Sequence, residues 1–154
     1  MRISVRAYGF KMYEEKLFRV SENVVRPQRA FLHAADFLMH ITDMTFESQG
    51  RRGGGSWKRI SEAWKARKED LNLDPRILHA TLRLRKSLTR RGHSEQVLIM
   101  NRKELKFGTS VPYAGRQNAV RPFLKLTSSD RRMLANEIVD EFVSPFHYGR
   151  RRRR

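Results

Sequence analysis

The sequence predicts an α+β fold, in which an antiparallel β-sheet packs against a long helix in the N-terminal half and a second helix near the C-terminus. Three patterns lead to this prediction. Apolar side chains recur at helical spacing in residues 27–49, and again in residues 127–143. Between these segments, residues 96–101 form an apolar run typical of a central strand. Residues 104–109 then alternate apolar with polar or small side chains, as in a half-buried strand.

Length and composition define the class of protein. The 154 residues suffice for one domain, which we assign to residues 1–146, followed by a basic tail at 147–154. Lysine and arginine number 33 against 16 acidic residues, a net charge of +17. Such a domain attracts polyanions, so we expect nucleic acid as the first partner class and an acidic protein surface as the second. The chain lacks cysteine, and no apolar run reaches the about 20 residues that cross a bilayer. We expect a cytoplasmic product without a membrane partner.

The N-terminal quarter predicts one strand and two helices. Residues 2–7 alternate apolar side chains with Arg2, Ser4 and Arg6, which indicates a strand with one basic face, either a protected edge or a binding strand. Helical spacing within 11–20 predicts a short helix. The longest element spans 21–49, with Pro27 in a first helical turn. Its apolar stripe consists of Phe31, Leu32, Ala35, Leu38, Met39 and Thr42, extended by Ile41 and Phe46.

Residues 50–55, GRRGGG, predict a flexible hinge. Arg51 and Arg52 in this loop are candidates for contact with phosphate or with an acidic partner. Ser61 then predicts the N-cap of a helix that ends near residue 70, with Lys58, Arg59, Lys65, Arg67 and Lys68 on its solvent-facing side. We interpret Trp57 and Trp64 as core residues in preference to platforms on which bases stack.

A turn at 72–75 precedes a predicted helix at 77–87. An antiparallel meander of three strands is expected at 87–91, 96–101 and 104–109. Gly108, Pro112 and Gly115 then predict an irregular loop at 109–120, which the arm Arg121-Pro122-Phe123-Leu124 closes. Phe107 and Phe123 complete the predicted core.

The C-terminal helix is predicted from its capping residues. Thr127 and Asp130 have the spacing of a capping box, and Pro145 is expected to end the helix near residue 143. Five arginines follow, namely Arg150, Arg151, Arg152, Arg153 and Arg154. This run repels itself and suits phosphate or an acidic surface; the alternative is a solubilising tip.

The sequence shows no pattern of catalytic residues. No serine lies in a Gly-x-Ser-x-Gly motif, and the five histidines show neither an HExxH motif nor the spacing of a metal pair. His33 and His40 are seven residues apart, so we interpret them as exposed side chains of a polar helix face. Acidic residues are few and scattered, which disfavours a two-metal site. We expect a protein that is not an enzyme and needs neither metal nor cofactor.

Six short pieces occur in a recognisable order along residues 46–143. They are Phe46-Glu47-Ser48-Gln49-Gly50, Ser56-Trp57, a Leu-x-x-Thr-x-x-Leu-x-x-Ser segment from Leu78 to Ser87, Phe107-Gly108-Thr109, Tyr113-Ala114 and Arg121-Pro122-Phe123-Leu124. In these pieces the chain resembles the virion-morphogenesis, or tail-completion, proteins of tailed bacteriophages, of the Mu-like G protein type, and the broader group of neck proteins. Two differences stand out. The family usually carries Gly where this chain has Leu82, and a His-Gln-x-Gly-like run where it has Gly115-Arg116-Gln117-Asn118.

The resemblance implies a structural virion protein that forms a ring at the head–tail junction, around the DNA channel, and serves head–tail joining. The implied partners are further copies of the chain in a ring of six or twelve, other neck proteins, head-completion or portal proteins, tail tube or terminator proteins, and genomic DNA in the lumen. Such a protein assembles in the bacterial host cytoplasm and ends in the virion neck.

A ring joins two different faces of each copy. We expect the 109–120 loop on one face, through Thr109, Tyr113, Arg116 and Gln117, and helix 27–49 or strand 2–7 on the other. Two alternatives stay open, a tail terminator of the same junction and a free basic nucleic-acid-binding protein.

Overall fold

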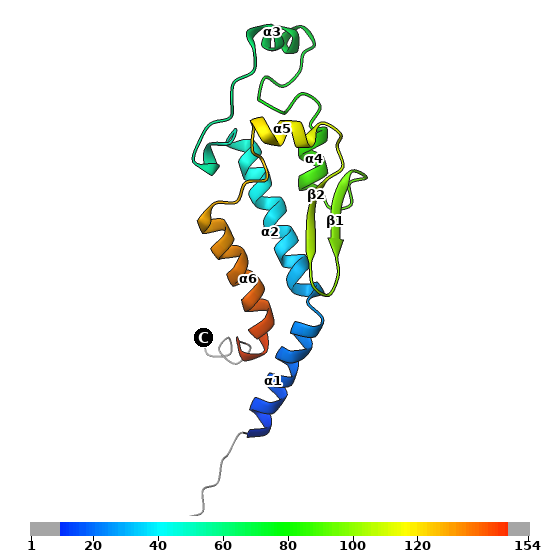
Figure 1. Cartoon of the computed structure of the whole chain (residues 1–154), viewed down its shortest axis with the longest axis vertical. Coiled ribbons are helices and arrows are strands. Elements are labelled where there is room, and N and C mark those ends of the chain that lie inside the picture. Colours follow the sequence, from blue (N-terminus) through cyan, green and yellow to red (C-terminus); the bar gives the residue numbers. More distant parts are fainter. Residues whose placement is uncertain (1–9, 148–154) are drawn as a thin grey trace, which may run out of the picture.

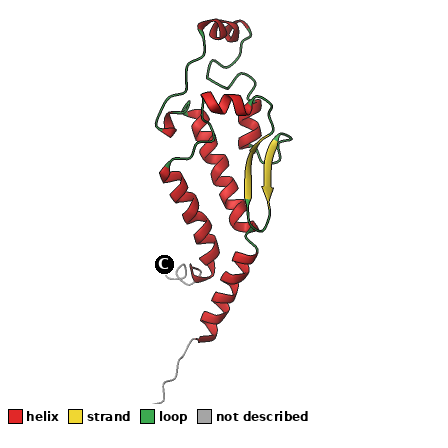
Figure 2. Cartoon of the chain, in the orientation of Figure 1, coloured by secondary structure: helices red, strands yellow, loops and turns green. Residues whose placement is uncertain are grey.

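The computed structural model describes residues 10–147, which form an elongated body of helices and one β-hairpin (Figure 1; Figure 2). In chain order the elements are α1 (Phe10–Val25), α2 (Gln28–Glu47), the 3-10 helix η1 (Arg51–Gly53), α3 (Glu62–Asp70), α4 (Arg83–Thr89), β1 (Gln96–Met100), β2 (Leu105–Thr109), α5 (Ala114–Val120) and α6 (Ser128–His147). The predicted α+β class is confirmed. The predicted strand 2–7 and the arginine tail lie outside the described residues.

Helix α2 is the element around which the body is arranged. It contacts α6 on one side and α4 and the hairpin on the other (Figure 1). Its buried side chains are Ala30, Ala34, Ala35, Met39, Ile41, Thr42, Thr45 and Phe46. The buried residues in the first half of this helix are small, whereas the second half contributes the larger core side chains Met39, Ile41 and Phe46. Within residues 10–147, no helix is long and apolar enough to cross a membrane.

The predicted element 21–49 is two helices, separated at Arg26 and Pro27. Pro27 precedes the first turn of α2, since proline lacks the N–H group that a helix interior requires. The short helix expected at 11–20 is confirmed and extends over the whole of α1. α1 lies beyond the N-terminal end of α2 and packs against the C-terminal half of α6 (Figure 1).

The sheet has two strands in the described part of the chain, so the predicted three-stranded meander is wrong in its first strand. β1 and β2 pair antiparallel, from Gln96 opposite Thr109 to Met100 opposite Leu105. Residues 87–91 instead lie largely in α4, where Leu84 and Leu88 are one helical turn apart and both buried. Two leucines at this spacing fit a helix face better than a strand, whose side chains alternate.

Four other predicted elements can be compared in detail. Helix 77–87 begins only at Arg83, because Leu78 and Leu82 take left-handed backbone angles of φ 60° and 56°. The irregular loop 109–120 contains α5, with Gly115 in its first turn. α3 is confirmed, and the backbone N–H of Trp64 donates to the Ser61 hydroxyl at its N-terminus. α6 continues through Pro145 rather than ending before it.

The core lies where the C-terminal end of α2 meets α4, β2 and α5. Phe46 is central, and its ring packs at 5.4 Å from Trp57 and at 5.6 Å from Phe123, measured between ring centroids. Trp57 and Phe123 are 5% and 1% exposed, in agreement with the sequence prediction, and Phe107 is half-buried against them. Trp64 is 41% exposed, so its prediction as a core residue is wrong. It belongs to α3, which stands away from the core at one end of the body (Figure 1).

Candidate nucleic-acid interface

In the glycine-rich loop after α2, which composition predicts as a flexible hinge, the first glycine packs directly against Trp57. Gly50 has φ +82°, and a Cβ atom there would lie 2.8 Å from Cγ of Trp57 and closer still to Cδ1. The Trp57 backbone N–H donates to the Gln49 carbonyl at 3.1 Å, and its indole Nε1–H donates to the Pro122 carbonyl at 3.3 Å. Gly50 therefore lets the backbone pass directly over the indole ring, which joins the loop to the arm before α6.

Arg52, a predicted contact for phosphate or an acidic partner, instead forms an ion pair within the protein. Its guanidinium forms a two-point ion pair with Asp130, in which Nη1 lies 2.7 Å from Oδ2 and Nη2 donates to Oδ1. Asp130 is fully buried. These hydrogen bonds, together with those from Thr127, hold the pKa of the Asp130 carboxyl well below its usual range. The structure therefore corrects the assignment of Arg52 to an external partner.

The same Asp130 completes the capping box predicted for α6. Its carboxylate accepts the Thr127 backbone N–H at 2.9 Å, and its own backbone N–H donates to the Thr127 hydroxyl at 3.1 Å. One buried carboxylate therefore begins α6 and ties η1 to it. Arg52 is positioned for this role by Ser48, whose hydroxyl accepts the Arg52 backbone N–H.

Around this buried pair lies a surface that is positive and carries no compensating carboxylate. We call it the basic end, and it consists of Arg51, Lys58, Arg59, Lys125, Arg131 and Arg132. All six side chains are exposed, and none forms an ion pair with another described residue. The one acidic residue among these segments, Asp130, is buried and neutralised by Arg52. The basic end is thus a concentration of unpaired positive charge.

Contacts between the contributing segments make the basic end continuous. Arg121 donates to the carbonyls of Lys58 and Arg59, which fixes that stretch of chain beside the arm before α6. The Lys125 side chain passes 4.0 Å from the position of a Cβ on Gly53, and both residues border a shallow hollow of about 130 Å³. Arg131 lies in the first turn of α6, where a cation opposes the helix dipole and an anion is favoured.

Besides Arg52, five of the twelve arginines that lie outside the basic end in residues 10–147 form an ion pair with a carboxylate. Arg29 binds Glu141 at 2.7 Å, Arg85 binds Asp43 at 2.7 Å, and Arg91 binds Asp36 at 2.6 Å. The positive charge of the protein is therefore uneven in its availability. The arginines that contact α2 carboxylates are compensated internally, whereas no cation of the basic end has a carboxylate partner among the described residues.

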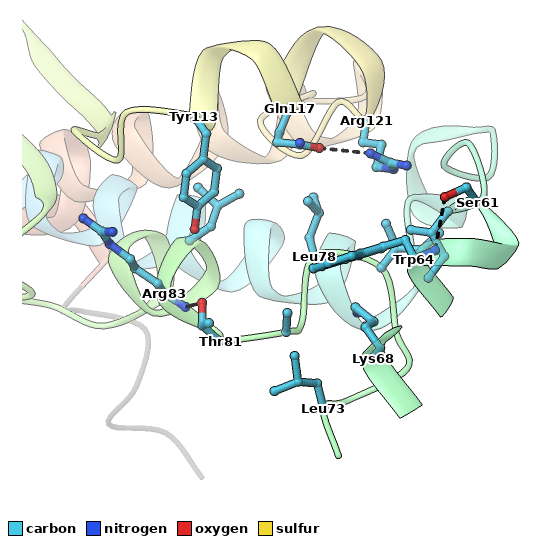
Figure 3. Close-up of a pocket in the computed structure, with 14 residues that line it drawn as sticks. Ser61, Trp64, Lys68, Leu73, Leu78, Thr81, Arg83, Tyr113, Gln117 and Arg121 are labelled. Atoms are coloured by element: carbon cyan, nitrogen blue, oxygen red, sulfur yellow. Dashed lines mark hydrogen bonds between the residues drawn. The ribbon is translucent and has the colours of Figure 1, made fainter. Parts of the chain in front are cut away.

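The four residues predicted for an inter-subunit loop separate in the structure. The Thr109 hydroxyl lies 2.7 Å from the Ser87 hydroxyl, a contact that joins β2 to α4. Tyr113 and Gln117 line a groove of about 660 Å³ between α5, α3 and the segment between α3 and α4 (Figure 3). Arg116 is exposed and does not line that groove.

A buried polar network holds one wall of this groove, and sequence reasoning missed it. Lys68, predicted on the solvent-facing side of α3, is 2% exposed and donates to the carbonyls of Asp74 and Arg76 at 2.8 and 2.7 Å. His79 is fully buried, with Nδ1 at 2.9 Å from the Ile77 carbonyl and Nε2 at 3.1 Å from Nη1 of Arg85. Burial lowers the pKa of His79, so the neutral ring donates through Nδ1 and accepts through Nε2.

Comparison with protein-family models, with curated proteins and with solved structures found no match to this chain. Among the described residues, no three histidine or acidic side chains come together in a group that could hold a metal ion.

Gln49 also belongs to the buried polar network, and it lies in a sequence piece that the sequence analysis singled out. Its side-chain carbonyl accepts the Ile77 backbone N–H at 2.6 Å, and its amide donates to the Phe46 carbonyl at 2.8 Å. Gln49 lies in the Phe-Glu-Ser-Gln-Gly piece, beside the Gly50 that carries the loop over Trp57. The piece thus contains three residues with different contacts: Phe46 packs in the core, Gln49 binds the backbone of Ile77, and Gly50 packs against Trp57.

Proposed function

We propose that this chain is a non-enzymatic structural protein of a tailed bacteriophage, a neck or tail-completion component that forms a ring at the head–tail junction around the DNA channel. One observation carries the proposal. The six pieces that resemble the family are scattered over about 80 residues, yet each contributes a side chain to one cluster. These side chains are Phe46, Trp57, Leu84 with Leu78, Phe107, Ala114 and Phe123. The pieces therefore share one part of the fold, the core around Phe46, as expected if they form one structural unit.

A second observation concerns the position at which this chain departs from the family. Leu82 stands where the family usually has Gly, and its backbone lies in the left-handed region at φ 56°, as the N-cap of α4. Glycine is the residue that adopts this conformation without strain. The backbone is thus the one that the family's glycine would favour, which supports the resemblance at a point where the side chains differ.

The charge distribution supports the placement around DNA. A ring that surrounds a genome meets phosphate along one surface and protein along its others. The basic end offers six exposed cations, none of which is paired with a carboxylate of the described residues, whereas Arg29, Arg85 and Arg91 are each paired with a carboxylate. Genomic DNA would accordingly face the basic end, and the portal, tail tube or terminator proteins would meet the flanking surfaces.

The basic end is also consistent with a second function, that of a free nucleic-acid-binding protein. A free nucleic-acid-binding protein would use the same cations, and it would bind DNA as a monomer with strong salt dependence. The two functions differ in what the protein does without DNA. A neck protein forms a ring by protein contacts alone, since those contacts build the channel.

The test is the mass and shape of the purified full chain with and without double-stranded DNA. We expect a closed ring of six or twelve copies without DNA, measured by mass photometry and seen in negative-stain images, and its attachment to isolated phage tails. A monomer at every protein concentration, together with tight and salt-sensitive DNA binding, would overturn the proposal in favour of the alternative. Attachment of the ring to tail tubes but never to portal complexes would identify a tail terminator instead.

A further inference from the structure

Helix α1 has an apolar face that nothing in the described part of the chain covers. Tyr13, Leu17, Phe18, Val24 and Val25 are each more than half exposed, and Leu17 and Phe18 reach 60% and 64%. At about 100° per residue, these side chains fall within roughly 140° of the helix circumference. Exposure of this much clustered apolar surface is unfavourable for an isolated chain and marks a contact surface.

The opposite flank of α1 makes the contact with α6. The Asn23 amide donates to the Phe142 carbonyl at 3.2 Å, and the Lys16 ammonium lies 5.6 Å from the Phe146 ring centroid. The apolar face is therefore not a poorly packed part of the α1–α6 interface. It points away from the body along the whole helix.

Glu14 lies inside the apolar face, between Leu17 and Phe18 when the helix is viewed along its axis. It is exposed, and it forms no ion pair with any other residue in 10–147. A carboxylate that becomes buried without a cation carries a large desolvation cost. Exposed Lys11 lies one helical turn before Glu14, at the edge of the face beside Phe18, so a surface that also offers a cation to Glu14 itself is the more favourable cover.

The groove beside α3 and α5 is lined by apolar and basic side chains, which complement the apolar face of α1 and its Glu14. Its apolar lining includes Trp64, Leu73, Ile77, Leu78 and Tyr113, and its volume of about 660 Å³ accommodates several large side chains (Figure 3). Three cations line it, and none of its lining residues is acidic. Arg83 is paired with Glu95, and Lys68 is buried against backbone carbonyls, so Arg121 is the cation that has no carboxylate partner among the described residues. Its acceptors there are neutral, among them the Gln117 side chain at 3.0 Å.

The helix and the groove cannot meet within one molecule. α1 lies at one end of the long axis and the groove lies at the other, beside α3 and α5 (Figure 1). We propose that α1 of one copy occupies the groove of a neighbouring copy, with its apolar face on Trp64 and Leu78 and Glu14 directed at Arg121. This contact joins two different surfaces, so it can repeat around a ring; the closure of that ring rests on the proposed function, whereas the contact needs only a second copy.

Pairing of α1 with α1 is the competing arrangement, and the charges oppose it. Two apolar faces brought together would place the Glu14 carboxylates of both copies in one interface, with Lys11 at the edge of each face as the nearest cation. The groove supplies arginine instead. It also includes Tyr113 and Gln117, two residues that the sequence assigns to inter-subunit contacts.

Engineered cysteines test the contact, because the natural chain has none and every disulfide then reports a designed pair. One full-length variant carries Leu17→Cys and a second carries Thr81→Cys, a small exposed position that lines the groove. We expect a disulfide between the two variants when they are mixed under mild oxidation, identified by mass spectrometry. Glu15→Cys, on the opposite side of α1, is the matched control and should give little product. Gln117→Cys is a second groove position, and Glu14→Gln should weaken self-association about tenfold.

Each result has a defined meaning. Folded variants that give no Leu17–Thr81 and no Leu17–Gln117 product, or Leu17→Cys chains that couple only with each other, would overturn the contact. A ring that assembles without these products would leave the proposed function intact and refute the contact alone. Products formed in chains that build open filaments or pairs, but never a ring, would support the contact and refute the ring.

Discussion

Gly50 is held in place by two independent constraints, a left-handed backbone and the indole of Trp57. Gly54 has nearly the same backbone angle, φ +83°, but nothing lies within 4 Å of a Cβ there. The two glycines therefore separate backbone strain from steric overlap within a single loop.

Gly50→Ala is expected to lower the free energy of unfolding by more than Gly54→Ala. Both substitutions carry a left-handed strain of about 1–2 kcal/mol, and only Gly50→Ala adds overlap with Trp57, worth about 1–3 kcal/mol. Urea denaturation followed by circular dichroism measures both. Equal decreases for the two variants would show that Trp57 moves aside without cost.

Leu82 adopts a conformation that suits glycine, and this gives a prediction of opposite sign to the one that applies inside a helix. Leu82→Gly should be more stable than Leu82→Ala by about 1 kcal/mol, because both remove the leucine side chain but only glycine relieves the left-handed strain. Thermal denaturation of the two variants decides the matter, and a more stable alanine variant would mean that the backbone at residue 82 relaxes out of the left-handed region.

Among the elements, α6 depends on the loop after α2 for its beginning. Arg52→Ala would leave the fully buried Asp130 carboxylate without its cation, which we expect to cost about 3–5 kcal/mol. Arg91→Ala removes an ion pair between two largely exposed side chains, Arg91 and Asp36, and should cost at most about 1 kcal/mol. Urea midpoints of the two variants compare a buried pair with an exposed one; similar midpoints would indicate that water enters the Asp130 site.

The same ion pair makes the stability depend on acid pH. The folded-state pKa of Asp130 lies below its unfolded value, so its contribution is fully present above the unfolded pKa of about 3.9 and is lost as pH falls below that value. Asp130→Asn cannot titrate there, and its unfolding free energy should fall less steeply than that of the unmodified chain between pH 5 and pH 3, which is about one unit on either side of that pKa. Parallel pH profiles would contradict an ionised, paired Asp130.

At the scale of the whole molecule, charge and apolar surface are segregated. The basic end gathers cations that have no carboxylate partner, and α1 presents apolar side chains at the far end of the body.

Removal of charge from the basic end should weaken DNA binding in a salt-dependent way. Lys125→Gln with Arg131→Gln is expected to reduce the slope of log K against log salt concentration by roughly 0.9 for each phosphate that the variant no longer neutralises. Arg29→Gln with Arg91→Gln removes the same charge from residues already paired with Glu141 and Asp36, and its slope should stay near that of the unmodified chain. Fluorescence anisotropy with a double-stranded oligonucleotide gives both slopes, and identical slopes for the two double variants would exclude the basic end as the DNA-binding surface.

Local rules in the sequence predicted much of the fold. Ser61 and Thr127 with Asp130 begin helices through hydrogen bonds to residues three positions away, and the apolar residues of α2 repeat at helical spacing. Trp57 and Phe123 were identifiable as core residues because large aromatic side chains bury the most surface. These features depend on near neighbours or on hydrophobicity alone, and both can be read from the order of residues.

What the sequence could not provide were the contacts between distant segments. The partner of Arg52 is 78 positions away, so the sequence placed this residue in solvent while the tertiary structure buries its charge against Asp130. Lys68 and His79 are likewise polar residues that only the folded chain supplies with buried partners. The sequence alone thus determined the α+β class, most helices and the excess of positive charge. The tertiary structure decided which of those charges are neutralised internally and which stay available, because ion pairing depends on proximity in space, which residue order does not encode directly.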